Sequence, residues 1–130
     1  MLAYSPRELR VPAELTRLPE ARAFAERAAR EYGFDSHDAY QIKSAVSEAV
    51  ANAIEHGSAG SWDEVTLEAV DEAGAFVLYV RDSGSFRPRV TRGGDLPERG
   101  RGLQFVGQMM DEVDVRPGPR GTEVRMLKRR

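Results

Sequence analysis

Three polar side chains are spaced so that they would share one face of a helix. Glu48, Asn52 and His56 follow one another at intervals of four residues, which places them in one column when the segment is drawn as an α-helix. The column borders the apolar stripe of that helix, at the boundary between core and solvent. A ligand bound there would displace water without unpairing the core. An ordinary solvated helix edge would carry the same residue types, and these residues alone leave both interpretations open.

Two glycine-containing motifs lie further along the chain, and the second has the residue types of an anion site. Asp82-Ser83-Gly84 follows the most apolar stretch of the chain, although a carboxylate before glycine also commonly caps a turn. Gly100-Arg101-Gly102 directly precedes Leu103, where a helix is predicted to begin. Helix N-termini bind anions through free N–H groups, and glycines let the backbone approach a phosphate closely. The P-loop signature is absent, and so is the Rossmann fingerprint, because Phe105 stands where its third glycine would be.

The composition limits the chemistry that these residues can do. The 130 residues include no cysteine and only two histidines, His37 and His56, which excludes disulfides, thiolate catalysis, cysteine-based zinc sites and His-x-x-x-His metal sites. The longest purely apolar run, residues 75–80, is too short to span a membrane. The first ten residues lack a signal pattern, so a cytoplasmic location is expected. Catalysis would have to use carboxylates, hydroxyls, amides and arginines.

Charge is distributed unevenly along the chain. Residues 1–82 hold 8 basic and 15 acidic residues, a net charge of −7, whereas residues 83–130 hold 11 and 6, a net charge of +5. A basic C-terminal part could bind nucleic acid or a small phosphorylated ligand. Only Phe86 and Phe105 supply aromatic rings there, which argues against direct binding of nucleic acid.

The column on Glu48, Asn52 and His56 requires a helix to position it. Apolar residues at helical spacing predict one helix from Pro19 to the stop at Gly33. A second helix is predicted from a cap at Asp35 or Ser36 to a C-terminal stop at Gly57. A short third helix is predicted over residues 103–110.

Apolar residues that alternate with polar ones predict the strands. Leu9 and Val11 indicate an edge strand that ends at Pro12. Residues 65–69 and 76–80 predict a hairpin with a turn at 71–74 and a more buried second strand.

The C-terminal part completes the predicted fold. Residues 113–115 and 122–127 predict a closing hairpin around the turn Pro117-Gly118-Pro119. The glycine- and proline-rich residues 83–101 predict a long connection that is either a functional lid or disordered. The expected fold is α+β: a two-layer sandwich in which about three helices cover one face of a mostly antiparallel sheet, as a single domain over residues 1–130.

The ordered set of motifs resembles the Bergerat ATP-binding fold shared by gyrase, Hsp90, sensor histidine kinases and MutL. Within that fold the chain is most similar to the small anti-sigma factor serine-protein kinases. The motifs that match are an N-box, EAVANAIEHG at 48–57, and three glycine boxes, DSG at 82–84, GRGL at 100–103 and GT at 121–122.

The resemblance implies roles for individual residues. Asp82 would accept the adenine amino group, Gly84 would admit the ring, and Thr122 would support the same pocket. Asn52 would ligate Mg²⁺ through its amide oxygen. Glu48 would be the general base that takes the proton of a substrate serine.

The phosphates would be held by the region before the third helix. The resemblance implies Gly100, Gly102 and Leu103 as phosphate-binding residues, and Arg99 or Arg101 as a clamp on the transferred charge. His56 and Phe86 complete the implied nucleotide site. The family's second glycine in the first box is replaced here by Ser85, and Glu98-Arg99 before the second box also departs from the usual order.

The resemblance also implies partners. The expected function is an ATP-dependent serine-protein kinase and anti-sigma factor that phosphorylates a STAS-type anti-anti-sigma protein and sequesters a sigma factor, as a homodimer formed through the strand near Leu9 and Val11. No membrane or direct nucleic-acid partner is expected. The alternative is a non-catalytic nucleotide-binding module that acts only by protein binding.

Overall fold

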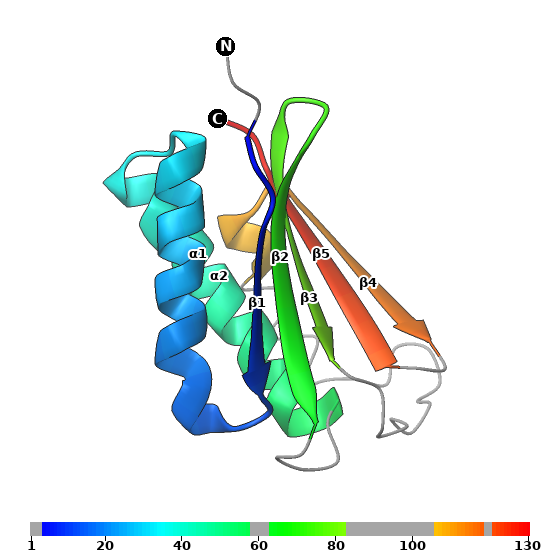
Figure 1. The fold of residues 1–130 in the computed structure, drawn as a ribbon. Coiled ribbons are helices and arrows are strands. Elements are labelled where there is room, and N and C mark those ends of the chain that lie inside the picture. The colour runs from blue at the N-terminus through cyan, green and yellow to red at the C-terminus, as the bar shows by residue number, and fades with distance from the viewer. Residues whose placement is uncertain (1–3, 58–62, 83–105, 119–120) are drawn as a thin grey trace.

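The described part of the chain forms a two-layer α+β sandwich. The computed structural model describes residues 4–57, 63–82, 106–118 and 121–130. Its sheet is antiparallel, with the strand order β1-β2-β3-β5-β4, so β1 and β4 are the edges (Figure 1). The strands are β1 (Arg7–Pro12), β2 (Glu64–Glu72), β3 (Ala75–Asp82), β4 (Glu112–Gly118) and β5 (Gly121–Lys128).

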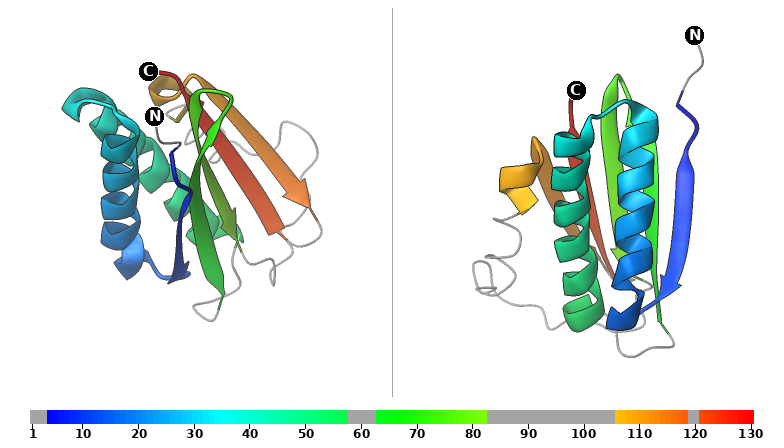
Figure 2. Two further views of the ribbon diagram at one scale, coloured as in Figure 1. Left: turned by 45° about the horizontal axis from the view of Figure 1, so that its top comes forward. Right: turned by 90° about the vertical axis from the view of Figure 1, so that its left-hand side faces the viewer.

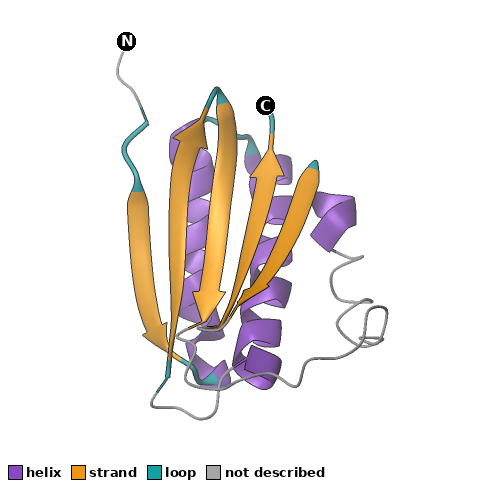
Figure 3. Ribbon diagram, turned by 90° about the vertical axis from the view of Figure 1, so that its right-hand side faces the viewer, coloured by secondary structure: helices purple, strands orange, loops and turns teal. Residues whose placement is uncertain are grey.

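Two long helices pack on one face of this sheet. A 3₁₀ turn, η1 (Leu15–Arg17), leads into α1 (Leu18–Tyr32), which ends at Gly33 with the left-handed φ of 117° that favours glycine. Asp35 caps α2 (Ser36–Asn52) by accepting a hydrogen bond from the Asp38 N–H at 2.9 Å. Figure 2 shows both helices lying along the same face, and Figure 3 looks onto the face that carries no helix. The expected fold class is confirmed.

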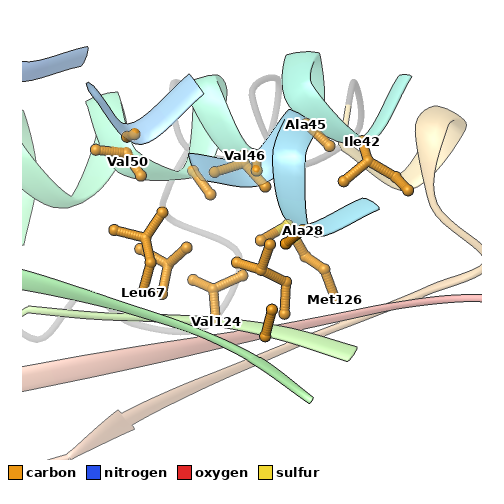
Figure 4. Packing of buried hydrophobic residues seen from close by; sticks show 14 of the residues in the cluster. Ala28, Ile42, Ala45, Val46, Val50, Leu67, Val124 and Met126 are labelled. Atoms are coloured by element: carbon orange, nitrogen blue, oxygen red, sulfur yellow. The ribbon is translucent and has the colours of Figure 1, made fainter. Parts of the chain in front are cut away.

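The core lies between the helix layer and the sheet. The inward residues of α2 interdigitate with alternate residues of β2, β3 and β5, as Figure 4 shows for Ile42, Val46, Leu67 and Met126. All four side chains are fully buried. The buried side of α1 consists of small residues, which allow that helix to pack closely against α2. They are Ala21, Ala25, Ala28 and Ala29.

An aromatic cluster closes the core where α1 ends. The ring of Tyr32 lies 5.0 Å from that of Tyr4, 5.7 Å from Phe34 and 5.2 Å from Phe76. The Tyr32 hydroxyl also donates to Asp71. This cluster fixes the end of the sandwich that lies away from the C-terminus of α2 (Figure 1).

Two predicted turns are wrong in extent. Asp71 and Glu72 belong to β2, and the first turn consists of Ala73 and Gly74 with φ of 53° and 87°. Such a two-residue turn needs positive φ at both positions, and alanine does not signal it. In the closing hairpin Pro117 and Gly118 belong to β4, because proline is tolerated on an edge strand.

The predicted lid and the first three residues of the predicted third helix fall outside the described residues. Residues 106–109 form a helical turn, with Val106 fully buried and Met110 nearly so, as the apolar spacing predicted. Residues 83–105, which include the predicted lid, are not described. Among the helices that the structure does describe, none is long and apolar enough to cross a membrane.

Candidate functional site

The C-terminal end of α2 and the adjoining ends of β3 and β5 enclose a cavity. It holds about 340 Å³ of space, part of which opens to solvent. Figure 1 shows these three ends meeting at the lower edge of the sandwich. Asn52, Asp82 and Thr122 line the cavity together, so the structure brings together three of the residues predicted from separate motifs. The remaining lining residues are Ala49, Ala53, Val80, Val115 and Val124.

Asp82 is fixed at the end of β3. Its side chain is 8% exposed, and both carboxylate oxygens accept from the Thr122 N–H, at 3.1 and 3.2 Å. Alternation along β3 puts Asp82 on the same face as Val80, toward the helices. The buried carboxylate therefore has a partner in the backbone N–H of Thr122.

The backbone of β5 aims the Thr122 N–H at that carboxylate. Regular pairing of β3 with β5 ends at Arg81 and Glu123, and Asp82 and Thr122 follow as the next opposing residues. Gly121 has a φ of 122°, which other residues rarely adopt. The sequence marked Gly121 only as part of a motif, whereas the structure gives it this conformational role.

Two buried polar atoms in the cavity wall make no hydrogen bond within the described structure. They are Nδ2 of Asn52 and Oγ1 of Thr122. Burying a polar group without a partner costs about 1–3 kcal/mol, and native proteins avoid it in most places. Because both atoms line the same cavity as Asp82, a polar ligand seated there would satisfy them. This is the strongest structural indication that the cavity is a binding site.

The other walls are small and apolar. Ala49 and Ala53 face the cavity from the helix, and Val80, Val115 and Val124 face it from the strands. Alanine on the helix keeps space open that a larger residue would fill. Apolar walls with a few fixed polar groups are typical of sites for small molecules and cofactors. The sequence predicted these residues as core, since nothing in their spacing separates a core wall from a cavity wall.

Glu48 and Asn52 stand one helical turn apart on α2, as predicted, and both are half-buried. The column does not continue with α-helical geometry. A π-helical turn, η2 (Ala53–Gly57), follows Asn52, so the expectation of an α-helix as far as Gly57 is wrong. π-Helical turns occur often at functional sites. The His56 backbone belongs to this turn, and its side chain lies outside the described structure.

The remaining predicted site residues are not described. Gly84, Phe86, Arg99, Gly100, Arg101, Gly102 and Leu103 all fall within residues 83–105. Across the described ranges, no three His, Asp or Glu side chains cluster to hold a metal. Asn52 lines the cavity, and its amide oxygen is of the kind that Mg²⁺ accepts beside waters and phosphate oxygens.

Comparisons with known proteins identify relatives of this chain. The family model of the histidine kinase-like ATPase domain matches residues 11–128. The anti-sigma F factor of Halalkalibacterium halodurans is 38% identical over 98 residues, 68% of this chain and 67% of that protein. The anti-sigma F factor of Clostridium acetobutylicum is 34% identical over 97 residues, 68% of each chain.

Solved structures share the architecture. A crystal structure of the RsbU and RsbW domains of a Mycobacterium tuberculosis protein matches with a TM-score of 0.74 and 25% identity, over 96% of this chain. This chain spans about a third of that longer one, 32%. The histidine kinase domain of a blue-light activated histidine kinase from Erythrobacter litoralis shares the fold with a TM-score of 0.58 at 21% identity. The chain therefore belongs to the histidine kinase-like ATPase domain family, in the branch that contains the anti-sigma factors.

Proposed function

We propose that the protein is an ATP-dependent serine-protein kinase that also acts as an anti-sigma factor. The observation that carries the proposal is the cavity at the end of α2, where the fixed carboxylate of Asp82 and the unpartnered polar atoms of Asn52 and Thr122 converge. The match to an ATPase domain supports ATP as the nucleotide. The names of the relatives, anti-sigma F factors, support a sigma factor as a binding partner.

Asp82 would recognise the adenine base. A carboxylate offers about four lone-pair sites, so the Thr122 N–H leaves capacity for the exocyclic amino group of adenine. Guanine would present a keto oxygen to the same carboxylate and be repelled. Thr122 would add its hydroxyl to the polar contacts of the base, and the alanine and valine walls would cover the ring faces.

Glu48 would act as the general base. It stands one turn before Asn52 on α2, so a nucleotide whose base lies at Asp82 and whose phosphates pass Asn52 would bring its terminal phosphoryl group toward Glu48. The carboxylate would accept the proton of a substrate serine as its hydroxyl oxygen attacks that phosphorus. The bond from phosphorus to the bridging oxygen breaks, and the products are phosphoserine, ADP and a proton held on Glu48.

Asn52 would hold Mg²⁺ through its amide oxygen. Amide oxygens are hard ligands that magnesium accepts, and the Nδ2 end of the same amide is the buried atom without a partner. Bound there, the ion would neutralise phosphate charge. Gly100, Gly102 and Leu103 would bind the phosphates, with Arg99 or Arg101 as the clamp and with His56, Gly84 and Phe86 completing the nucleotide contacts. These assignments extend the proposal to residues beyond the described ranges.

The protein substrate would be a STAS-type anti-anti-sigma protein. The proposed assembly is a homodimer through β1, which lies at an edge of the sheet with β2 on its other side. Unpaired strand edges readily pair with another chain. Sedimentation of a monomer at micromolar concentration would contradict the dimer without affecting the kinase assignment.

A phosphate-transfer assay tests the kinase assignment. Wild-type protein with labelled ATP and a STAS-domain partner should transfer phosphate to a serine, and Glu48→Gln should lose about 100-fold or more of that rate while still binding ATP. Glu26→Gln is the matched control, because Glu26 lies on α1 beside Lys43 at 3.7 Å and away from the cavity. Undiminished transfer by Glu48→Gln would refute its role as base. Nucleotide and sigma-factor binding without any transfer would favour the non-catalytic module instead.

A further inference from the structure

A three-residue ion-pair clamp lies on the helix-free face of the sheet, next to the strand ends that carry Asp82 and Thr122. Arg81 on β3 bridges Glu123 on β5, from Nε at 2.8 Å, and Glu68 on β2, from Nη1 at 3.0 Å. The clamp therefore joins three strands. Figure 3 looks onto the face where it lies.

The clamp is more constrained than a typical surface ion pair. The side chains of Arg81, Glu68 and Glu123 are 37%, 33% and 28% exposed, and the Arg81 guanidinium stands 4.6 Å from the centre of the Tyr79 ring. Tyr79 is itself held by its hydrogen bond to Glu72. Isolated exposed pairs contribute little, but a partly shielded arginine with two carboxylates and a ring beneath it loses much of its freedom.

The pKa of Arg81 agrees with a charged guanidinium in the clamp. Burial works against the charge of Arg81, but its hydrogen bonds with Glu123 and Glu68 outweigh that effect and raise its pKa. The hydrogen bond from Tyr79 and that from Arg125, at 2.7 Å, lower the pKa of Glu72 and favour its carboxylate form. The ion-pair partners of Arg81 are the carboxylates of Glu68 and Glu123, and Arg116 on β4 stands opposite Glu123 in the register of β4 with β5.

The clamp sits at the last regular rung between β3 and β5. Arg81 and Glu123 are the final register pair of the two strands. The next residues along each strand are Asp82 and Thr122, whose contact runs from a backbone N–H to a side chain. All four residues line one groove of about 530 Å³, open to solvent, at the ends of these strands.

We propose that Arg81 is a positioning residue for nucleotide binding. By tying β5 to β3 at their last rung, it keeps the Thr122 N–H on the carboxylate of Asp82, and so holds Asp82 in the orientation that receives the base. Without the clamp the ends of the two strands separate more easily, the Thr122 N–H leaves Asp82, and the base-binding carboxylate turns toward water. The inference rests on the proposed function of the cavity, since it concerns the affinity of that site.

Four variants test the clamp arm by arm. Arg81→Met removes the guanidinium and keeps the stem, and Glu123→Gln removes the negative charge from the arm between β3 and β5. Glu68→Gln removes the negative charge only from the arm to β2. Arg116→Met is the matched arginine control, since Arg116 lines the same groove but pairs within β4, with Asp114 at 2.8 Å.

The measurements are the Kd for ADP by calorimetry and the exchange rate of the Thr122 amide proton relative to amides in the middle of β5. Arg81→Met and Glu123→Gln should raise the Kd about tenfold, the scale of coupling within a shared network, and should speed exchange at Thr122 selectively. Glu68→Gln should have a smaller effect, and Arg116→Met should stay within about twofold. In phosphate transfer, KM for ATP should rise while kcat at saturating ATP stays unchanged.

Each outcome is decisive. Tight ADP binding by wild type with an unchanged Kd in Arg81→Met, or an equal loss in Arg116→Met, overturns the positioning role and leaves the proposed function intact. Failure of wild type to bind ADP overturns the proposed function and the positioning role together. If Arg81→Met does not fold, Glu123→Gln still decides, because faster exchange at Thr122 together with weaker ADP binding is required of it.

Discussion

Replacing Thr122 by valine should have opposite effects on stability and on nucleotide binding. Thr122 is 8% exposed, and its Oγ1 is buried with no hydrogen-bond partner in the described structure. Valine has nearly the same shape and puts a methyl group where the hydroxyl is. The backbone N–H that serves Asp82 is unaffected, because only the side chain changes.

The magnitudes follow from the cost of an unsatisfied buried hydroxyl. Such a group costs about 1–3 kcal/mol, so Thr122→Val should raise the free energy of unfolding of the nucleotide-free protein by about 1 kcal/mol. The same hydroxyl becomes useful when a base is bound, and its loss should then weaken nucleotide binding about tenfold, or roughly 1.4 kcal/mol.

Urea denaturation with and without nucleotide separates the two effects. At a concentration of Mg-ATP analogue about 100 times the wild-type Kd, the ligand should add about 2.7 kcal/mol to wild type but only about 1.4 kcal/mol to the variant. Thr66→Val is the matched control, since Thr66 lies half-buried on the helix-free face of β2 and should change both quantities little. A nucleotide-free variant that is less stable than wild type, with an unchanged ligand effect, would refute the reasoning.

Three further perturbations have definite expected results. Asp82→Asn should raise the Kd for ATP at least about tenfold and reduce the preference for ATP over GTP, because a buried charge-assisted acceptor is lost. An unchanged ratio of the two Kd values in calorimetry would count against recognition of adenine by Asp82. Ile42→Ala should lower the free energy of unfolding by about 2–5 kcal/mol, since Ile42 is fully buried. Tyr40→Ala, at an exposed position of the same helix, should lower it by less than about 0.5 kcal/mol. Similar losses for the two variants in urea melts would contradict the assigned core. Burial and the hydrogen bond to Asp71 raise the pKa of Tyr32 from 10.0 to about 12, so the unfolded chain loses the Tyr32 proton at a lower pH than the folded protein does, and the stability present below pH 10 should fall as the pH rises toward 12. Tyr32→Phe should make that fall shallower in melts measured across this pH range. Parallel curves for the variant and wild type would show that Tyr32 does not contribute.

The fold could be predicted from the sequence because each element buries one regular face. The inward positions of β2 alternate strictly, so Val65, Leu67 and Ala69 identify the strand and its buried side. In α2 the spacing of Ile42 and Val46 does the same with a helical period. These patterns arise because a two-layer sandwich buries one face of each helix and strand between the layers.

The structure differs from the prediction where main-chain geometry, and not burial, determines the conformation. The turn at Ala73 and Gly74 needs two positive φ values, and alanine gives no sign of them. The change to π-helical geometry after Asn52 leaves the apolar spacing unaltered, so a helical wheel extends α2 too far. Both features depend on local main-chain geometry that the hydrophobic pattern does not encode.

The site was predictable only in part for a similar reason. Asp82, Asn52 and Thr122 stand in motifs that a sequence displays, and the structure brings all three to one cavity. The hydrogen bond from Thr122 N–H to Asp82 depends on the register of β3 with β5. Strand register brings together residues that are far apart along the chain. The ion pairs of Arg81 with Glu68 and Glu123 therefore could not be predicted without the register of the sheet.

A crystal structure with a non-hydrolysable Mg-ATP analogue bound tests the central claim most directly. The account predicts that the base lies between Ala49 and Val124, with its amino group on Asp82 and the Thr122 hydroxyl in contact with it, and that Asn52 binds the metal through its amide oxygen. A base bound elsewhere, or a cavity in which Asp82 and Thr122 make no contact with the nucleotide, would contradict it.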